Sequence, residues 1–464
     1  MQARRMKLTQ EPATGIAAGS ASRAPGGLLG LDWLNRDLFW LFVLRVLRSF
    51  AQGFLGIITP LYIAMLGYDA IHLGILFAVA AVASAMISGA IGILADRFGR
   101  KTFLILISLM MGAGGVMFAL TRSFVLIVLA GALGSIGRGG ALGGAAWGPF
   151  YPAAQALIAE QASDERRTTV FGALAFVGVT SAAVGSLLAA MPHLLHRLFA
   201  IALLDGYRAL FLLTGPFGVA MALAVLPVRE LHSATVRARR ATRATLDPPA
   251  PATAGPWSER RLFGISARSW SLIWRFMVTN ATNGAAIGML GPFVVYWFYR
   301  RFGVTSTELA ELFFVLNLVS AIPYLLAGRI ALAFGSVRSV VISRAIATVL
   351  LFAVVLMPTF LLAAAVYTLR MIFNVLSIPV RQSYLMGVID PSERASAAGL
   401  ASFPSQVTSA VGPYLAGYFM QNFALGLPLE FAAAMQALNT LLYWVFFRNI
   451  YPPEEQLTSL SGGG

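Results

Sequence analysis

The amino-acid sequence predicts an all-α membrane protein in which twelve transmembrane helices form two pseudo-symmetric six-helix bundles. Three observations support this prediction. Hydrophobic residues make up 58% of the chain, charged residues only 11%, and the mean hydropathy is +0.76. Apolar segments long enough to cross a bilayer, about 20 residues each, recur along the chain. The polar motifs of the first half return in the second. This composition excludes an ordinary soluble domain.

Six predicted spans precede a polar interruption in the middle of the chain. Charged or turn-forming residues separate them, and several spans continue into the capped turns that bound them. They cover residues 38–65, 70–92, 101–121, 124–148, 167–191 and 208–227.

Six further spans follow the interruption with a similar spacing. They cover residues 270–298, 306–333, 338–357, 359–388, 395–420 and 430–449.

The interruption itself is basic and contains the proline-rich run 247–251, which ends any helix. We expect its arginines to lie near anionic lipid headgroups, a site for a regulatory protein being the alternative. The predicted domains are a cytosolic N-terminal tail (1–36), an N-terminal bundle (37–228), a basic cytosolic linker (229–268), a C-terminal bundle (269–450) and a cytosolic C-terminal tail (451–464).

The net charge of +15 reflects membrane topology and not nucleic-acid binding, because the cations gather on one set of loops. The positive-inside rule therefore predicts that both chain termini are cytoplasmic. Arginine far outnumbers lysine, which favours a prokaryotic inner membrane. The first 36 residues lack a continuous apolar core and are predicted to be a tail and not a cleaved leader. The loop cations on this side are Arg97, Arg100, Lys101, Arg166, Arg167, Arg338, Arg344, Arg381 and Arg394.

The two halves share motifs at matching positions. Gly92 and Gly99 recur at the same spacing as Gly328 and Gly335, although Leu332 stands where Asp96 stood. The polar run 163–167 is echoed by 391–394, each at the start of a predicted span. Parallel repeats of six helices place a binding site between the halves, near the middle of the membrane.

The stretch Gly92–Lys101 is a short charged turn between two spans. Its form, G-x-L-A-D-R-x-G-R-K, resembles the signature loop between helices 2 and 3 of the major facilitator superfamily (MFS). The resemblance covers residues 37–450 and implies the MFS fold and transport by alternating access. It also implies that Asp96 sits against the start of the eleventh helix. The gating residues that it implies are Gly92, Asp96, Arg97, Gly99, Arg100, Lys101, Glu165 and Glu393.

Five arginines are assigned to the interior of the predicted spans, where a charge costs roughly 2.5–3.5 kcal/mol at the bilayer centre. They lie on the first, fourth, seventh and tenth spans, which line the central cavity in the superfamily. Arg45 and Arg275 are near enough to a helix end to snorkel to the headgroups, and Arg138 is as consistent with an architectural role. Including polar neighbours on the same faces, the predicted substrate-binding residues are Arg45, Arg48, Gln52, Arg138, Arg275, Asn283, Arg370 and Asn374.

No acidic residue of the sequence falls at mid-bilayer in the predicted spans. Buried arginines without carboxylate partners most naturally receive an anion, and arginine suits bidentate contact with carboxylate or phosphate. Arginines on the first and seventh helices also resemble the organophosphate:phosphate exchangers of the superfamily. That resemblance assigns Arg45 or Arg48, together with Arg275, to an anionic head group.

The predicted function is a secondary active or facilitative transporter for a small anionic solute, such as an organic anion, a phosphate ester or an inorganic anion. An antiporter is one form of this prediction. The alternative is an efflux pump for amphipathic drugs or lipids with an aromatic cavity. An enzyme or a non-transporting scaffold is disfavoured, because no nucleophile–histidine–acid set or metal-ligand cluster stands out. We expect no cofactor, a monomer, and contacts only with the solute and membrane lipids. The candidate cavity aromatics are Phe39, Trp40, Phe42, Trp147, Phe150, Tyr151, Phe293, Tyr296 and Trp297.

Overall fold

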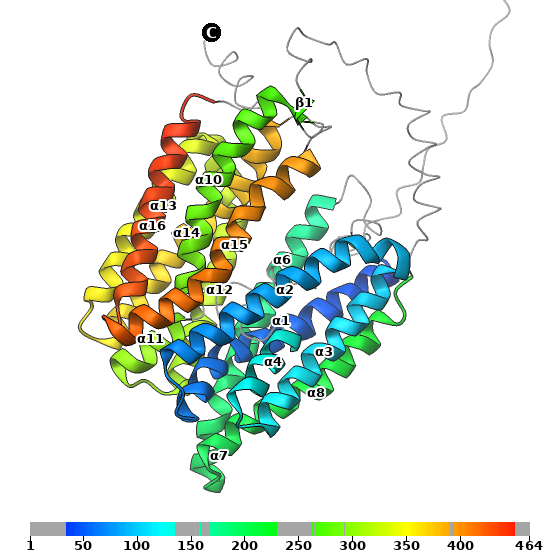
Figure 1. Cartoon of the computed structure of the whole chain (residues 1–464), viewed down its shortest axis with the longest axis vertical. Helices are drawn as coiled ribbons and strands as arrows, with labels where there is room; N and C mark the ends of the chain where they lie inside the picture. The colour runs from blue at the N-terminus through cyan, green and yellow to red at the C-terminus, as the bar shows by residue number, and fades with distance from the viewer. Residues whose placement is uncertain are drawn as a thin grey trace, which may run out of the picture. The chain divides into compact units, whose positions relative to one another are not determined.

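The computed structural model describes residues 34–134, 154, 157–158, 167–229, 261–262, 265–291, 293–389 and 394–450. The side chains at 89–98 and at a few other helical positions are not among those described. The described chain is almost entirely helical (Figure 1). A two-stranded antiparallel pair, β1 (Arg261–Leu262) with β2 (Ile265–Ser266), directly precedes the first helix of the C-terminal half.

The N-terminal half runs from α1 to α8. Its elements are α1 (Arg36–Met65), α2 (Ala70–Phe98), α3 (Arg100–Leu120), α4 (Phe124–Gly134), α6 (Arg167–Leu187), the short 3₁₀ turn η2 (Leu188–Ala190), α7 (Met191–Phe199) and α8 (Leu203–Val225).

The C-terminal half runs from α10 to α16. Its helices are α10 (Ala267–Leu290), α11 (Phe293–Phe302), α12 (Ser306–Phe334), α13 (Ser336–Leu356), α14 (Phe360–Val388), α15 (Arg394–Asn422) and α16 (Leu427–Phe447).

Most predicted spans agree with these helices, and three differ. The fifth span continues through η2 and α7, because the segment 191–199 is amphipathic and prolongs the helix beyond its apolar part. The seventh, predicted as one span, divides between α10 and α11, which end and begin on either side of the sequence Gly291-Pro292, where proline lacks a backbone donor. The predicted fourth span is described only as far as Gly134.

The ends of the long helices gather on two faces, because successive helices reverse direction. We call the face that holds the start of α1, the α2–α3 turn and the start of α10 the terminal face. The opposite face, which holds the turn at 66–69 between α1 and α2, is called the turn face.

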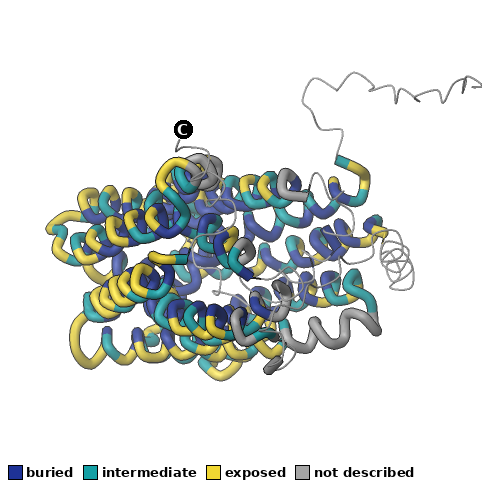
Figure 2. The backbone as a smooth tube through the Cα atoms, turned by 90° about the horizontal axis from the view of Figure 1, so that it is seen from above, coloured by how far each residue is buried: buried dark blue, intermediate teal, exposed yellow. Residues whose placement is uncertain are grey.

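Most of the long helices have a buried side and an exposed side, as the alternating colours of Figure 2 show. Large apolar residues such as Leu120, Leu356 and Leu361 are more than 70% exposed, which suits a surface facing lipid. Eight described segments are long and apolar enough to cross a membrane. Helices α10, α15 and α16 fall short of that hydropathy because they carry amides, hydroxyls and prolines.

Small residues let the helices of each half approach closely. Any side chain at Gly185 of α6 would collide with the backbone carbonyl of Phe50 on α1. In the C-terminal half, Gly288 of α10 and Gly412 of α15 meet backbone to backbone. Close packing of small residues is the usual basis of helix association in a bilayer.

Candidate functional site

A buried arginine surrounded by amides lies at the centre of the C-terminal half. Arg344 of α13 is 5% exposed and donates hydrogen bonds to three asparagine side chains on three other helices. Nη1 donates to Oδ1 of Asn374 on α14 (3.0 Å), and Nη2 donates to Oδ1 of Asn439 on α16 (3.2 Å) and to Oδ1 of Asn283 on α10. One guanidinium therefore joins four helices.

Two further arginines of α14 extend this arrangement. Arg370 is 4% exposed; it donates from Nη2 to Oε1 of Gln436 (3.3 Å) and lies over the ring of Tyr367. Gln436 in turn donates to Asn374, so that both arginines share one amide network. Arg381 donates to Oδ1 of Asn280 at 2.6 Å and lies over the ring of Tyr443. We call these residues the guanidinium–amide cluster: Asn280, Asn283, Arg344, Arg370, Asn374, Arg381, Gln436 and Asn439.

The described partners of the cluster are neutral. Within the described part of the chain, two carboxylates form ion pairs, Asp69 with His72 and Asp205 with Arg208. Neither pair includes a residue of the cluster. Nε of Arg344 and Nε of Arg370 are buried and find no hydrogen-bond acceptor among the described residues. Amide oxygens satisfy hydrogen bonds but do not neutralise charge, and an isolated buried cation is costly. The cluster therefore has positive charge and unused donors.

The N-terminal half holds its arginines differently. Arg48 is 1% exposed, and its Nη1 lies 3.7 Å from Sδ of Met111 on α3. The guanidinium of Arg45 lies against Gly178 of α6, where any side chain would collide with it. Oε1 of Gln52, one turn further along α1, is buried and lacks a described hydrogen-bond partner. These residues share one stretch of α1, as their spacing predicts.

The structure places six of the eight predicted substrate-binding residues in two groups. Asn283, Arg370 and Asn374 lie together in the guanidinium–amide cluster, while Arg45, Arg48 and Gln52 lie on α1. Arg275 belongs to neither group, because its Nη1 donates to the backbone carbonyl of Phe446 on α16 (3.3 Å). Arg138 is outside the described residues.

The assignment of Arg344 and Arg381 to the loop cations was wrong. Both lie inside helices, in α13 and α14, and Arg344 donates to three members of the cluster. Gln436 and Asn439 were also missed. Their helix α16 was predicted only as a membrane span, and the available signal was the recurrence of amides at buried helical spacing.

The signature turn is a sharp one. Helix α2 ends at Phe98 and α3 begins at Arg100, so that Gly99 alone joins them, with φ of 85°. Gly335 joins α12 to α13 in the same way, with φ of 81°. A left-handed φ favours glycine at both positions.

The gating contacts predicted for the signature turn fall mainly outside the described side chains. Lys101 donates to the backbone carbonyl of Leu226 at the end of α8, within the same half. The side chains of Asp96 and Arg97, and the whole of Glu165 and Glu393, are outside the described set. Their gating roles stay predictions.

Among the predicted cavity aromatics, the described ones of the C-terminal half are packed into the core. Phe293, Tyr296 and Trp297 of α11 are at most 6% exposed, and Trp297 contacts Phe298 and Phe302. Trp147, Phe150 and Tyr151 lie outside the described residues. Phe39, in contrast, is 48% exposed at the start of α1 and stacks edge-on against Trp40.

Comparison with known proteins identifies the family of this architecture. The model of the Major Facilitator Superfamily matches residues 41–282 and 276–463. An uncharacterized membrane protein of Saccharomyces cerevisiae is 22% identical over 412 residues, which are 86% of this chain and 91% of that protein. The quinolone resistance protein NorA of Staphylococcus aureus is 24% identical over 174 residues, 37% of this chain and 42% of NorA.

A solved structure shows the same fold. A bacterial homologue of the human lysosomal transporter Spinster, in an inward-facing and occupied conformation, superposes with a TM-score of 0.65 at 18% identity. The match covers 89% of this chain and 96% of that one. At this identity, the likeness establishes the arrangement of helices and not the solute.

Proposed function

Because this chain belongs to the Major Facilitator Superfamily, a family of multi-pass membrane transporters, we propose that it carries a small anionic solute by alternating access. The transport activity in this proposal follows from the family and the fold. The anion is the new part of the proposal, and the guanidinium–amide cluster supports it.

The single observation that carries the proposal is the charge of the cluster. Arg344, Arg370 and Arg381 are linked to amides on neighbouring helices, and their described partners are neutral. Removing one partner from a buried ion pair typically costs about 3–5 kcal/mol, so a cluster with several unneutralised cations strongly favours an anion nearby. Nε of Arg344 and Nε of Arg370, which have no described acceptor, can donate to an oxygen of a carboxylate or phosphate. Arg45 and Arg48 on α1 are the second candidate contact.

A second candidate function is efflux of amphipathic drugs, and the likeness to NorA favours it. That likeness covers only 37% of this chain. The α11 side chains that would form a drug cavity are instead buried in aromatic packing: Phe293 contacts Tyr296 and Phe77 of α2, and Trp297 contacts Phe298 and Phe302. The anion proposal is therefore preferred.

The orientation and surroundings of the protein are also proposed. The concentration of arginine and lysine at the terminal face favours cytoplasmic termini by the positive-inside rule. A monomer in contact with anionic lipid through the basic linker is consistent with the family and with the charge. Residence in a prokaryotic inner membrane rests on the excess of arginine alone, and the relative that covers most of the chain is from a yeast.

Ligand-dependent thermal stability of the purified protein tests the proposed binding. A solute that binds only the folded protein raises its unfolding temperature. We expect phosphate, glycerol 3-phosphate or succinate to raise the Tm of the wild type, whereas uridine and ethidium do not. Arg370→Gln removes the shift, and Arg338→Gln, an exposed arginine on α13, keeps it. A shift with ethidium alone, or an anion shift that survives Arg370→Gln, contradicts the proposal.

A further inference from the structure

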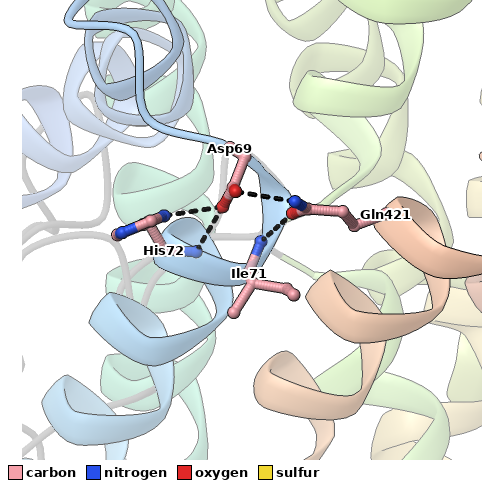
Figure 3. A network of polar contacts seen from close by, with 4 residues as sticks. All are labelled: Asp69, Ile71, His72 and Gln421. Atoms are coloured by element: carbon pink, nitrogen blue, oxygen red, sulfur yellow. Dashed lines mark hydrogen bonds and ion pairs between the residues drawn. The ribbon is translucent and has the colours of Figure 1, made fainter.

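The two halves are joined across the turn face by a hydrogen-bonded contact between α2 and α15 (Figure 3). Nε2 of Gln421, near the end of α15, donates to Oδ2 of Asp69, the residue before α2, at 2.7 Å. The backbone N–H of Ile71 donates to Oε1 of the same Gln421 at 3.2 Å. Both polar ends of one amide are thus used by the opposite half. We call this contact the Gln421 latch.

A second contact joins the halves between α7 and α12. Nδ1 of His193 lies 2.9 Å from Oγ of Ser306, the first residue of α12. Ser306 is 1% exposed. We call this contact the His193 latch.

The two latches occupy equivalent positions in the internal repeat. The spacing from Gly67 to Gly303, both with positive φ, equals the spacing from Gly99 to Gly335. The same spacing aligns Asp69 with Thr305, and each caps its helix by accepting from the backbone N–H three residues later. Ser306 therefore corresponds to the first residue of α2.

The partners on the other side correspond as well. The spacing from Glu165 to Glu393, taken from the repeated polar runs, equals that from His193 to Gln421. His193 and Gln421 therefore occupy equivalent positions in the two repeats. His193 faces the start of α12, and Gln421 faces the start of α2.

Further contacts between the halves lie deeper beneath both latches. A side chain at Gly74 of α2 would collide with the carbonyl of Pro413 on α15, and one at Gly417 would collide with the carbonyl of Ala70. Beneath the His193 latch, Oγ of Ser186 lies 3.4 Å from the carbonyl of Ala310. Both interfaces are therefore sealed at the turn face, and opening that face separates them.

We propose that Gln421 and His193 are repeat-related positioning residues of the transport cycle, which hold the turn face closed and release it when that face opens. They differ from the residues of the signature turn, which lies on the terminal face. The inference depends on alternating access between the halves and not on the solute, so it stands if the anion proposal fails.

Because the chain contains no cysteine, one introduced thiol reports on the latch. Ala70 is 4% exposed beneath the Gln421 latch, so Ala70→Cys in lipid nanodiscs should react slowly with a water-soluble maleimide. Gln421→Glu sets two carboxylates against each other, and we expect labelling to accelerate about fivefold or more, the equivalent of about one net hydrogen bond. Asn422→Asp, which adds the same charge to an exposed side chain bonded within its own helix, should label as the parent does.

An exchange of the two groups distinguishes the latch from a general loss of packing. In Asp69→Asn with Gln421→Glu, the carboxylate again accepts from an amide and from the N–H of Ile71, and asparagine still caps α2. We expect this double variant to return labelling to the parental rate. Unchanged labelling in Gln421→Glu, or equally fast labelling in the double variant, overturns the role of Gln421.

The His193 latch is tested with the same reporter, although the reporter lies in the other interface. If both latches hold one closed face, His193→Ala should also accelerate labelling of Ala70→Cys, and His193→Gln should restore the parental rate. His196→Ala is the matched control, because His196 bonds to Ile201 within its own half. Labelling unaffected by His193→Ala shows that the second contact does not hold the face closed and overturns the paired mechanism.

Discussion

The two terminal nitrogens of Arg344 donate hydrogen bonds to neutral amide oxygens, and no described carboxylate balances its charge. Its planar guanidinium has five donors in a fixed fork, and three asparagine oxygens from α10, α14 and α16 occupy two of its nitrogens. The amides are themselves oriented, since Nδ2 of Asn439 donates to Oγ1 of Thr282 (3.1 Å). This arrangement fixes the cation at the junction of four helices and leaves its charge available to an anion.

Replacement of Arg344 should destabilise the C-terminal half. Arg344→Met leaves the amide oxygens of Asn283 and Asn439 without their described donor, at about 1–3 kcal/mol for each unsatisfied group before relaxation, whereas Asn374 still accepts from Gln436. We expect a clear fall in Tm in differential scanning fluorimetry, with Arg344→Lys intermediate, because an ammonium cannot match the planar fork. Arg338→Met on the same helix should leave Tm nearly unchanged. Equal Tm values for the two methionine variants would show that the cluster does not stabilise the fold.

Asp69 links closure of the turn face to pH. Burial raises the pKa of Asp69, but hydrogen bonds from the side chains of His72 and Gln421 and from the backbone of His72 outweigh it and hold the pKa below its usual value. Only the hydrogen bond from Gln421 comes from the other half, so its share of the lowered pKa links the carboxylate to closure. That share favours the closed face above the free carboxyl pKa of about 3.9 and is lost as the pH falls through the lowered value.

Spin labels at Met65→Cys and Phe423→Cys measure this effect across the turn face. We expect the distribution of spin–spin distances from double electron–electron resonance to broaden toward longer separations as the pH is lowered from 6 to 3. The same labels with Asp69→Asn should show no such change over this range. A pH response of equal size in Asp69→Asn would assign the effect to other groups.

The candidate site could be predicted only in part from residue types. Arginine inside a span is a strong signal, so Arg48 and Arg370 were predicted as site residues. Asn283 and Asn374 were predicted from the helix positions that they share with Arg275 and Arg370, and both accept from Arg344. Arg344 was missed because it stands near enough to the start of its span to be counted with the loop cations. Neutral amides carry no charge, and Gln436 and Asn439 are therefore recognisable only once α16 is seen to face the arginines.

At the scale of helices, the boundaries follow directly from the physics of the sequence. The positive φ at Gly99 and Gly335 ends one helix and begins the next within a single residue, and both turns were expected from the repeated glycines. The division of α10 from α11 was not, because apolar residues continue on both sides of Pro292. Hydropathy measures burial in lipid and is insensitive to a local break in hydrogen bonding.

Packing of α1 against α6 gives an element-scale prediction. Gly185→Val places a branched side chain where even a Cβ would meet the carbonyl of Phe50, so α1 and α6 must separate. Overpacking of this kind costs typically about 1–3 kcal/mol or more, and Tm should fall accordingly. Gly172→Ala on the same helix meets no atom within 4 Å and should raise stability by about 0.5–1 kcal/mol. Similar Tm changes for both variants would refute the close contact.

The signature turn supplies a second prediction at this scale. Asp96 is proposed to interact with the positive end of α15 when the terminal face closes, an effect of about 0.3–1 kcal/mol at an exposed site. We expect Asp96→Asn to slow transport while expression and the Tm shift with bound anion stay close to wild type. A transport rate unchanged by Asp96→Asn would remove Asp96 from gating.

At the scale of the whole chain, the internal repeat organises both the fold and its movement. The repeat was visible in the sequence as paired glycines and polar runs. The contacts it produces across the turn face were not, because they depend on which residues of one half meet the other. Gln421 and His193 occupy equivalent positions yet differ in chemistry, and the cluster of buried cations is described in the C-terminal half alone. The two halves therefore share a framework and differ in the polar side chains that it carries.

Counterflow into proteoliposomes loaded with unlabelled solute tests the central claim most directly. The labelled probes are phosphate, glycerol 3-phosphate and succinate, compared with uridine and ethidium. We predict that at least one anion exchanges through the wild type and through Arg338→Gln but not through Arg370→Gln, whereas uridine and ethidium do not exchange. Exchange of uridine or ethidium without any anion, or anion exchange that is unaffected by Arg370→Gln, would contradict transport of an anion by this cluster.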